Sequence, residues 1–206
     1  MSASARLPAL PLFPLQTVLF PGGLLSLKVF EARYLDLVSS CLRDRSPFGV
    51  VCLRKGSEVR RGDDRVDLEV RGVLAELIEL DSVQPGILHA RCRGTQRFVL
   101  HSAEQREDGL WIGAAELLAD DAVLAPAAAM RSTVSGLASA IEALRAQGAA
   151  PFLEPLRFDD AGWVANRWCE ILPISAAAKQ KLMELDDPSV RLRLVDEFLR
   201  KNGVVN

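Results

Sequence analysis

The first half of the chain carries short apolar runs that are separated by turn-forming residues. Two of them, 12–19 and 24–30, flank the sequence Phe-Pro-Gly-Gly at 20–23. Proline presets a turn and glycine tolerates positive φ, so this pattern predicts a strand, a tight turn and a second strand. Further strands are predicted at 48–53, 66–80, 88–101 and 110–118. Gly72 falls inside the run 66–80 and predicts a bulge or a bend.

One segment of this half, 31–45, has helical periodicity and charged residues on its other side. Its apolar positions at helical spacing are Tyr34, Leu35, Val38, Cys41 and Leu42. The polar segment 54–65 predicts an exposed loop. Six or so short strands with one inserted helix favour a small, partly closed β-barrel.

Strand alternation stops after Asp121, and helical periodicity continues to the end of the chain. A long helix is predicted around 130–144, with Gly148 as its end. Asp159 and Asp160 are candidate caps of the next helix, which Pro173 would end. The fold class is therefore α+β, with a barrel over 1–121 and an α-helical bundle over 122–206.

The last two predicted helices begin at strong start signals. Ser175 is a candidate cap of a helix that extends to Leu185, and Asp187 followed by Pro188 predicts the start of the final helix. The apolar face predicted for the final helix consists of Val190, Leu194 and Phe198.

Composition narrows the class of protein. Hydrophobic residues make up 49% of the 206 residues and charged residues 25%, as in ordinary globular proteins. A net charge of -2 argues against nucleic-acid and membrane partners. Prolines interrupt the first apolar run, so neither a signal peptide nor a membrane span is expected there. Arginine outnumbers lysine 20 to 5, a bias typical of GC-rich bacterial genomes.

The cysteines indicate a reducing compartment. Cys41, Cys52, Cys92 and Cys169 stand far apart and form no C-x-x-C pair. We therefore expect four buried thiols and a cytoplasmic protein.

The common local signatures of catalysis are absent from the sequence. It contains no phosphate loop, no dinucleotide fingerprint, no H-E-x-x-H and no G-x-S-x-G. We expect no enzyme activity, no catalytic residue, no cofactor and no metal. A metal site at His89, Cys92 and His101, or an enzyme with an unfamiliar site there, is the weaker alternative.

Other candidate constellations have plainer explanations. Ser175 and Lys179 have the residue types of a catalytic dyad, but a helix cap and a surface lysine explain them. The acidic pairs at 63–64, 120–121, 159–160 and 186–187 fall at loops and helix starts. Arg91, Arg93 and Arg97 share strand parity and would form either a phosphate-binding strip or a solvated face. We expect Trp111, Trp163 and Trp168 to be core residues and not a cage that binds a ligand.

Several motifs, in order, resemble one known family. They are Leu10-Pro11-Leu12-Phe13-Pro14-Leu15, Val18-Leu19-Phe20-Pro21-Gly22, Leu27-Lys28-Val29-Phe30-Glu31-Ala32-Arg33-Tyr34, Phe48-Gly49-Val50-Val51, Gly72-Val73-Leu74-Ala75-Glu76-Leu77, Gly94-Thr95-Gln96-Arg97-Phe98, Leu172-Pro173-Ile174-Ser175 and Leu185-Asp186-Asp187-Pro188. Together they are similar to the amino-terminal substrate-binding domain of Lon-type ATP-dependent proteases.

The resemblance implies a PUA-like barrel with an appended helical bundle, in a free-standing, non-catalytic copy of the binding domain. It implies unfolded or degron-bearing polypeptides as ligands, and a role as adaptor or regulator of an ATP-dependent protease. An RNA-binding PUA-like protein is the alternative, and self-association through an open barrel edge is a further expectation.

The family motif is densest where the second strand meets the first helix. The candidate substrate-binding residues there are Phe30, Glu31, Arg33 and Tyr34. Tyr34 lies on the apolar face of the helix, and Phe30 is alternatively a core residue. We expect Glu31 and Arg33 to be the more exposed members.

Overall fold

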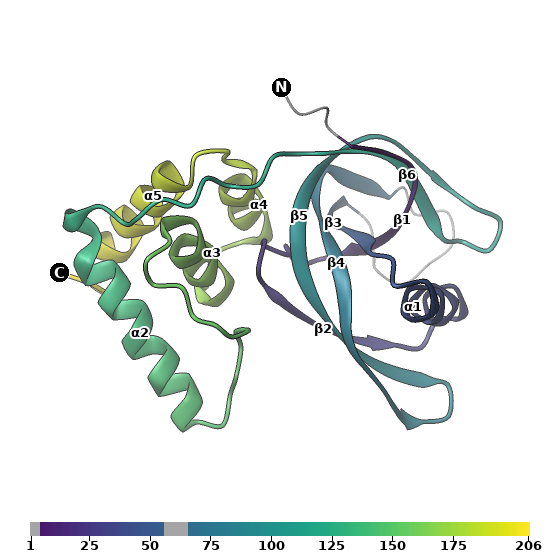
Figure 1. The fold of residues 1–206 in the computed structure, drawn as a ribbon, viewed down its shortest axis with the longest axis horizontal. Helices are drawn as coiled ribbons and strands as arrows, with labels where there is room; N and C mark the ends of the chain where they lie inside the picture. Colours follow the sequence, from purple (N-terminus) through teal and green to yellow (C-terminus); the bar gives the residue numbers. More distant parts are fainter. Residues whose placement is uncertain (1–4, 56–65) are drawn as a thin grey trace. The chain divides into compact units, whose positions relative to one another are not determined.

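The structure is a computed structural model that describes residues 5–55 and 66–206, and it is a mixed α+β protein as predicted (Figure 1). The chain divides into two compact units, Met1–Asp120 and Asp121–Asn206. The strands of the first unit are β1 (Arg6–Leu15), β2 (Leu24–Val29), β3 (Phe48–Lys55), β4 (Asp67–Gln84), β5 (Ile87–Gln105) and β6 (Trp111–Leu117), and its helix is α1 (Ala32–Asp44). The helices of the second unit are η1 (Ala128–Met130), α2 (Arg131–Ala146), α3 (Ala161–Ile171), α4 (Ala176–Glu184) and α5 (Pro188–Lys201).

The strands form one sheet in the order β2-β5-β4-β3-β1-β6. An additional pairing joins β5 to β6, so five of the strands form a closed circuit and β2 lies outside it. The β1–β3 pairing is parallel, and β2 and α1 provide the crossover that a parallel pair requires. Figure 1 shows β4 and β5 as long curved strands whose common turn projects beyond the rest of the unit.

Glycines let the strands of the first unit approach its core closely. The core contains Leu12, Val51 and Phe98. A Cβ on Gly72 would lie 2.4 Å from the Val50 carbonyl oxygen and 2.5 Å from the Phe98 ring. The register is irregular just beyond Gly72, which confirms the predicted bulge.

Helix α1 covers the predicted segment, but its buried face is shifted. Tyr34, Val38 and Cys41 are buried as predicted. Leu42 is 58% exposed, and Leu37 is buried in its place. The predicted face was therefore wrong at this position, because the helix buries one side of the stripe more deeply than the other.

The helix starts of the second unit follow the predicted capping signals. Asp160 accepts hydrogen bonds from two backbone N–H groups of α3, and Asp187 does the same for α5. The Ser175 hydroxyl accepts from the N–H of Ala178 at the start of α4. Each side-chain oxygen replaces a partner that the first turn of a helix lacks.

All four cysteines are free and buried, as predicted.

The final helix, α5, does not bury the predicted face. Leu194 is 39% exposed, whereas Leu192, Val195 and Leu199 are buried. The pattern misled because α5 also buries Arg191 and Asp196, two residues that a hydrophobic pattern assigns to the surface. Among the described residues, no helix is long and apolar enough to cross a membrane.

Candidate functional site

A pocket of about 340 Å³ lies on the first unit, where the end of β1, strand β2 and the first turn of α1 come together. Three of the four candidate residues line it, namely Phe30, Glu31 and Tyr34. The other lining residues are Phe13, Leu15, Thr17, Leu25, Ser26, Leu27, Lys28 and Val29. The lining is mainly apolar with a few polar groups, which is the usual composition of a binding pocket.

The two aromatic candidates have different positions in this pocket. Phe30 is 53% exposed, so the alternative that it is a core residue is wrong. It follows Val29, which is buried, and alternation along the strand turns the next side chain outward. Tyr34 is buried, and its ring stacks on Phe13 with 3.9 Å between ring centroids. Phe30 is thus open to a ligand, and the stacked pair supports the pocket.

The charged candidates, Glu31 and Arg33, form a structural pair. The Arg33 side chain is only 7% exposed, so the expectation that it is exposed was wrong. Its Nη1 donates a hydrogen bond to the carbonyl oxygen of Gly109 at 2.7 Å, and its Nη2 lies 2.8 Å from a Glu31 carboxylate oxygen. The guanidinium also lies 4.5 Å from the centre of the Tyr34 ring. Arg33 therefore holds Glu31 and Tyr34 in place and does not line the pocket.

Lys28 is a pocket residue that the sequence analysis did not identify as functional. It is exposed, and no ion pair with another described residue is found for it. The signal that could have found it is strand alternation: Ser26, Lys28 and Phe30 are exposed, whereas Leu25 and Val29 are buried. Because Glu31 is paired with Arg33, Lys28 has no acidic ion-pair partner among the described residues that line the pocket.

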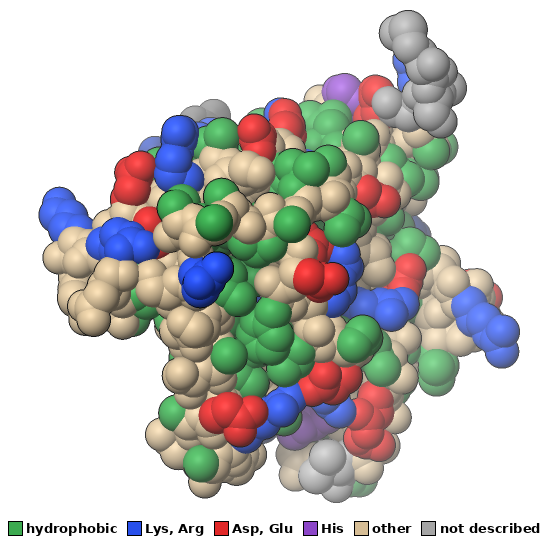
Figure 2. Space-filling view, turned by 60° about the vertical axis from the view of Figure 1, so that its left-hand side comes forward, with side chains coloured by type: hydrophobic (Ala, Val, Ile, Leu, Met, Phe, Trp, Pro, Cys, Tyr) green, Lys and Arg blue, Asp and Glu red, His purple; other side chains and the backbone are tan. Residues whose placement is uncertain are grey.

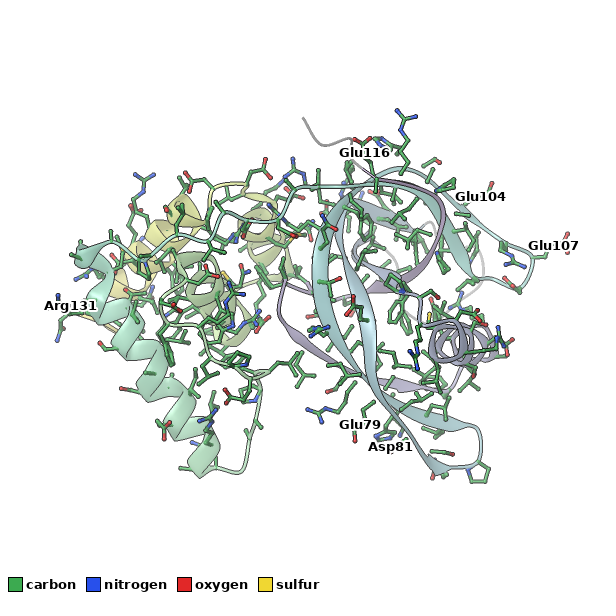
Figure 3. All side chains as sticks on the ribbon, viewed as in Figure 1. Glu79, Asp81, Glu104, Glu107, Glu116 and Arg131 are labelled. Carbon is green, nitrogen blue, oxygen red and sulfur yellow. The ribbon has the colours of Figure 1, made fainter. Side chains whose placement is uncertain are left out.

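The alternative metal site at His89, Cys92 and His101 does not form. His89 is exposed and Cys92 is fully buried, so the two side chains lie on different sides of β5. His101 is 3.3 Å from Glu116, which Figure 3 labels. Burial raises the pKa of the Cys92 thiol to about 12, which disfavours the thiolate that binds metals. Within residues 5–55 and 66–206 there is no group of three metal-binding side chains.

The Ser175–Lys179 pair is not a dyad in the structure. The Ser175 hydroxyl caps α4, and the Lys179 Nζ donates to the carbonyl oxygen of Glu170 at 2.9 Å. Of the acidic pairs, 159–160 and 186–187 supply helix caps, Asp121 pairs with Arg191, and 63–64 lies outside the described residues. Glu79 and Asp81 lie far from Glu104 and Glu107 in Figure 3, so these acidic side chains form no common cluster.

The predicted arginine strip is not a free basic surface. Arg91 pairs with Glu79 and Arg93 with Glu76, each at 2.8 Å. Arg97 is buried, because the register shift opposite Val73 and Ala75 changes the face that it occupies. Figure 2 shows positive and negative side chains interleaved on the visible face. These observations give the RNA-binding alternative no support.

The tryptophans of the second unit belong to its core. Trp163 and Trp168 are buried, and the indole Nε1 of Trp168 donates to the carbonyl oxygen of Thr133 at 3.0 Å. Trp111 is half-buried beside the core of the first unit. None of the three is an exposed ligand cage.

Helix α3 contains a buried ion pair that sequence patterns did not reveal. Arg167 is fully buried, and its Nη2 lies 2.7 Å from a Glu170 carboxylate oxygen. Burial raises the pKa of Glu170 to about 7, although Arg167 and Lys179 oppose the rise. This pair lies inside the helical unit and does not belong to the pocket.

The pocket is mainly apolar and lies beside β2, whose outer edge has no partner strand among the described residues, an arrangement that is typical of a binding surface. The family model for the substrate-binding domain of ATP-dependent protease La (LON) matches residues 9–201. The chain therefore belongs to the family of Lon substrate-binding domains, which confirms the resemblance seen in the sequence.

Two solved structures agree with this assignment. A crystal structure of a Lon N-terminal domain protein from Xanthomonas campestris is 32% identical, with a TM-score of 0.69; the match covers 92% of this chain and 97% of that one. The N-terminal domain of a Mycobacterium avium complex Lon protease is 16% identical, with a TM-score of 0.58, covering 92% and 96%. The second likeness shows the fold alone. Among curated proteins, none matches the chain significantly.

Proposed function

We propose that this chain binds unfolded or degron-bearing polypeptides, and that it holds them at the pocket between β2 and α1. The family supplies substrate binding as the general role. The observation that supports the location is Phe30, a large apolar ring that is 53% exposed at the rim of an apolar pocket. Exposed apolar side chains that border a pocket are typical of surfaces that bind other molecules.

The size of the pocket suits individual side chains of a polypeptide. Its volume of about 340 Å³ is at the lower end of the range for ligand pockets, about 300–1,000 Å³. Phe13, Leu25 and Tyr34 provide apolar walls, and the hydroxyl groups of Thr17 and Ser26 provide polar contacts. A folded protein presents few such side chains, whereas an unfolded segment presents many.

The test compares two exposed apolar residues of the first unit. Phe30→Ala removes the ring at the pocket, and Leu42→Ala removes a side chain that is similarly exposed but does not line the pocket. Binding to a chemically unfolded polypeptide and to an unstructured RNA is measured at physiological salt. We expect saturable polypeptide binding that Phe30→Ala weakens about tenfold, as for an aromatic anchor, and that Leu42→Ala leaves unchanged.

Two results would contradict this proposal. If the two substitutions weaken binding equally, the pocket beside Phe30 is not the binding site. If the chain binds only RNA, and does so in a salt-sensitive manner, it is an RNA-binding protein and not a polypeptide-binding one.

We also propose that the chain acts in ATP-dependent proteolysis as an adaptor or a regulator. Its binding of unfolded segments would either deliver them to an ATP-dependent protease or withhold them from it. Added wild-type protein should therefore change the rate at which such a protease degrades an unfolded substrate, and Phe30→Ala should abolish the change. An unchanged rate with the wild-type protein would contradict this role.

We infer that the closed circuit of five strands is a PUA-like barrel over 1–121, followed by a helical bundle over 122–206. Cytoplasm is the inferred compartment, because the four cysteines are free thiols.

A further inference from the structure

Strand β2 has one edge without a partner strand among the described residues. It stands at the end of the strand order and pairs only with β5. In an antiparallel pair, alternate residues direct their backbone N–H and C=O groups away from the partner. The outer edge of Leu24–Val29 therefore offers a row of hydrogen-bonding groups to another chain.

The pocket follows this edge. Its lining includes every residue from Leu25 to Val29, so it extends along the strand and not only across its end. The pocket also reaches Phe30 and Tyr34, which are apolar and lie where the strand gives way to α1. An extended segment along β2 would thus place its side chains beside the pocket walls.

The charge at this edge selects among extended segments. Lys28 is exposed and lines the pocket without a described ion-pair partner. The neighbouring positive charges are already compensated, since Arg93 pairs with Glu76 and Arg91 with Glu79 on the adjoining strands. Glu31 is compensated by Arg33. A carboxylate on the ligand would give Lys28 an ion-pair partner.

We propose that an extended polypeptide segment with a large apolar side chain and a nearby acidic one adds to the free edge of β2 as a further strand. Its backbone hydrogen-bonds to β2, its apolar side chain enters the pocket beside Phe30, and its carboxylate pairs with Lys28. The inference rests on the proposed function and adds the conformation and the chemistry of the bound segment. Backbone pairing suits a substrate-binding domain, because every unfolded segment carries the same backbone.

The experiment uses the full chain and labelled peptides of about eight residues, a length that covers a typical strand. One peptide carries leucine and aspartate two residues apart, so that both side chains lie on one face of the added strand, and a second has lysine in place of aspartate. Two more carry N-methyl groups on alternate backbone amides, one in each register, so that one of them blocks the N–H groups that face β2. Affinities are measured by fluorescence anisotropy for the wild-type chain, Lys28→Glu and Lys55→Glu. Lys55 is the matched control, an exposed strand lysine outside the pocket.

We expect the acidic peptide to bind the wild-type chain, and N-methylation in one register to weaken binding about tenfold. Lys28→Glu should weaken the acidic peptide about fivefold and strengthen the lysine peptide by a similar factor, whereas Lys55→Glu should change neither. The charge swap keeps the test informative, because a misfolded variant would lose both peptides.

Other outcomes overturn the inference in distinguishable ways. If unfolded polypeptide binds in a Phe30-dependent manner but both N-methylated peptides bind normally, strand addition is wrong and the proposed function stands. If no polypeptide binds, both are wrong. If the chain is a dimer in solution and Lys28→Glu makes it a monomer, a second copy occupies the edge in place of a peptide.

Discussion

Arg33 should stabilise the first unit more than any surface arginine, because it ties the start of α1 to the turn between β5 and β6. Replacing it in Arg33→Met keeps the length of the side chain and removes its charge. The substitution removes the 2.7 Å hydrogen bond from Arg33 to the Gly109 carbonyl oxygen and the 2.8 Å ion pair between Arg33 and Glu31. A hydrogen bond from a charged donor is worth about 1.5–3 kcal/mol, and a partly exposed ion pair about 0–1 kcal/mol.

The expected loss of unfolding free energy is therefore about 1.5–4 kcal/mol, which leaves a domain of ordinary stability folded. Arg43→Met is the matched control on the same helix, since the Arg43 side chain is 70% exposed and pairs with its neighbour Asp44. That control should change stability by less than about 0.5 kcal/mol. Urea unfolding at neutral pH measures both variants, and equal midpoints for the two would refute the assignment of Arg33 as a structural residue.

Three further predictions concern stability and reactivity. Burial raises the pKa of the Glu170 carboxyl to about 7 in the folded chain, above the ordinary value of 4.5, so its contribution to stability is present below about pH 4.5 and is lost as pH rises through about 7. Glu170→Gln should remove this loss, which is about 2–3 kcal/mol between about pH 5 and pH 8, from the free energies of unfolding that urea denaturation gives at the two pH values. Gly72→Ala should cost about 3 kcal/mol or more through its clash with the Val50 carbonyl, whereas Gly86→Ala, with open space around it, should cost about 1 kcal/mol in the same assay. Cys92 and Cys169, each with a pKa raised to about 12 by burial, should resist a thiol reagent until the chain unfolds, and rapid labelling of the folded protein would contradict their burial.

Features that depend on a few neighbouring residues were predictable from the sequence. A cap needs only a side-chain oxygen that accepts a hydrogen bond from a backbone N–H two or three residues later. Asp160, Ser175 and Asp187 are such caps. The helix at 32–44 followed from its periodicity for the same reason.

Features that depend on distant partners were not predictable. Parity along β5 failed at Arg97, because a register shift against β4 lies between it and Arg93. Burial of Arg191 depends on Asp121, which is 70 residues away in sequence. Hydrophobic patterns place such charges on the surface, and only the folded chain supplies the partners that make their burial tolerable.

The surroundings of the candidate residues were only partly predictable from the sequence. Family motifs pointed to Phe30, Glu31, Arg33 and Tyr34, and three of these line the pocket. Arg33 turned inward because its carbonyl partner, Gly109, comes from another part of the chain. The free edge of β2 depends on the order of strands in the sheet, which local sequence does not determine.

The most direct test of the account is residue-resolved hydrogen exchange of the chain with and without a saturating unfolded polypeptide. The proposed site predicts slower exchange of the backbone amides at 24–34, with little change in α2 to α5. Protection confined to the second unit, or no protection at saturation, would contradict the pocket between β2 and α1 as the place where this domain holds its substrates.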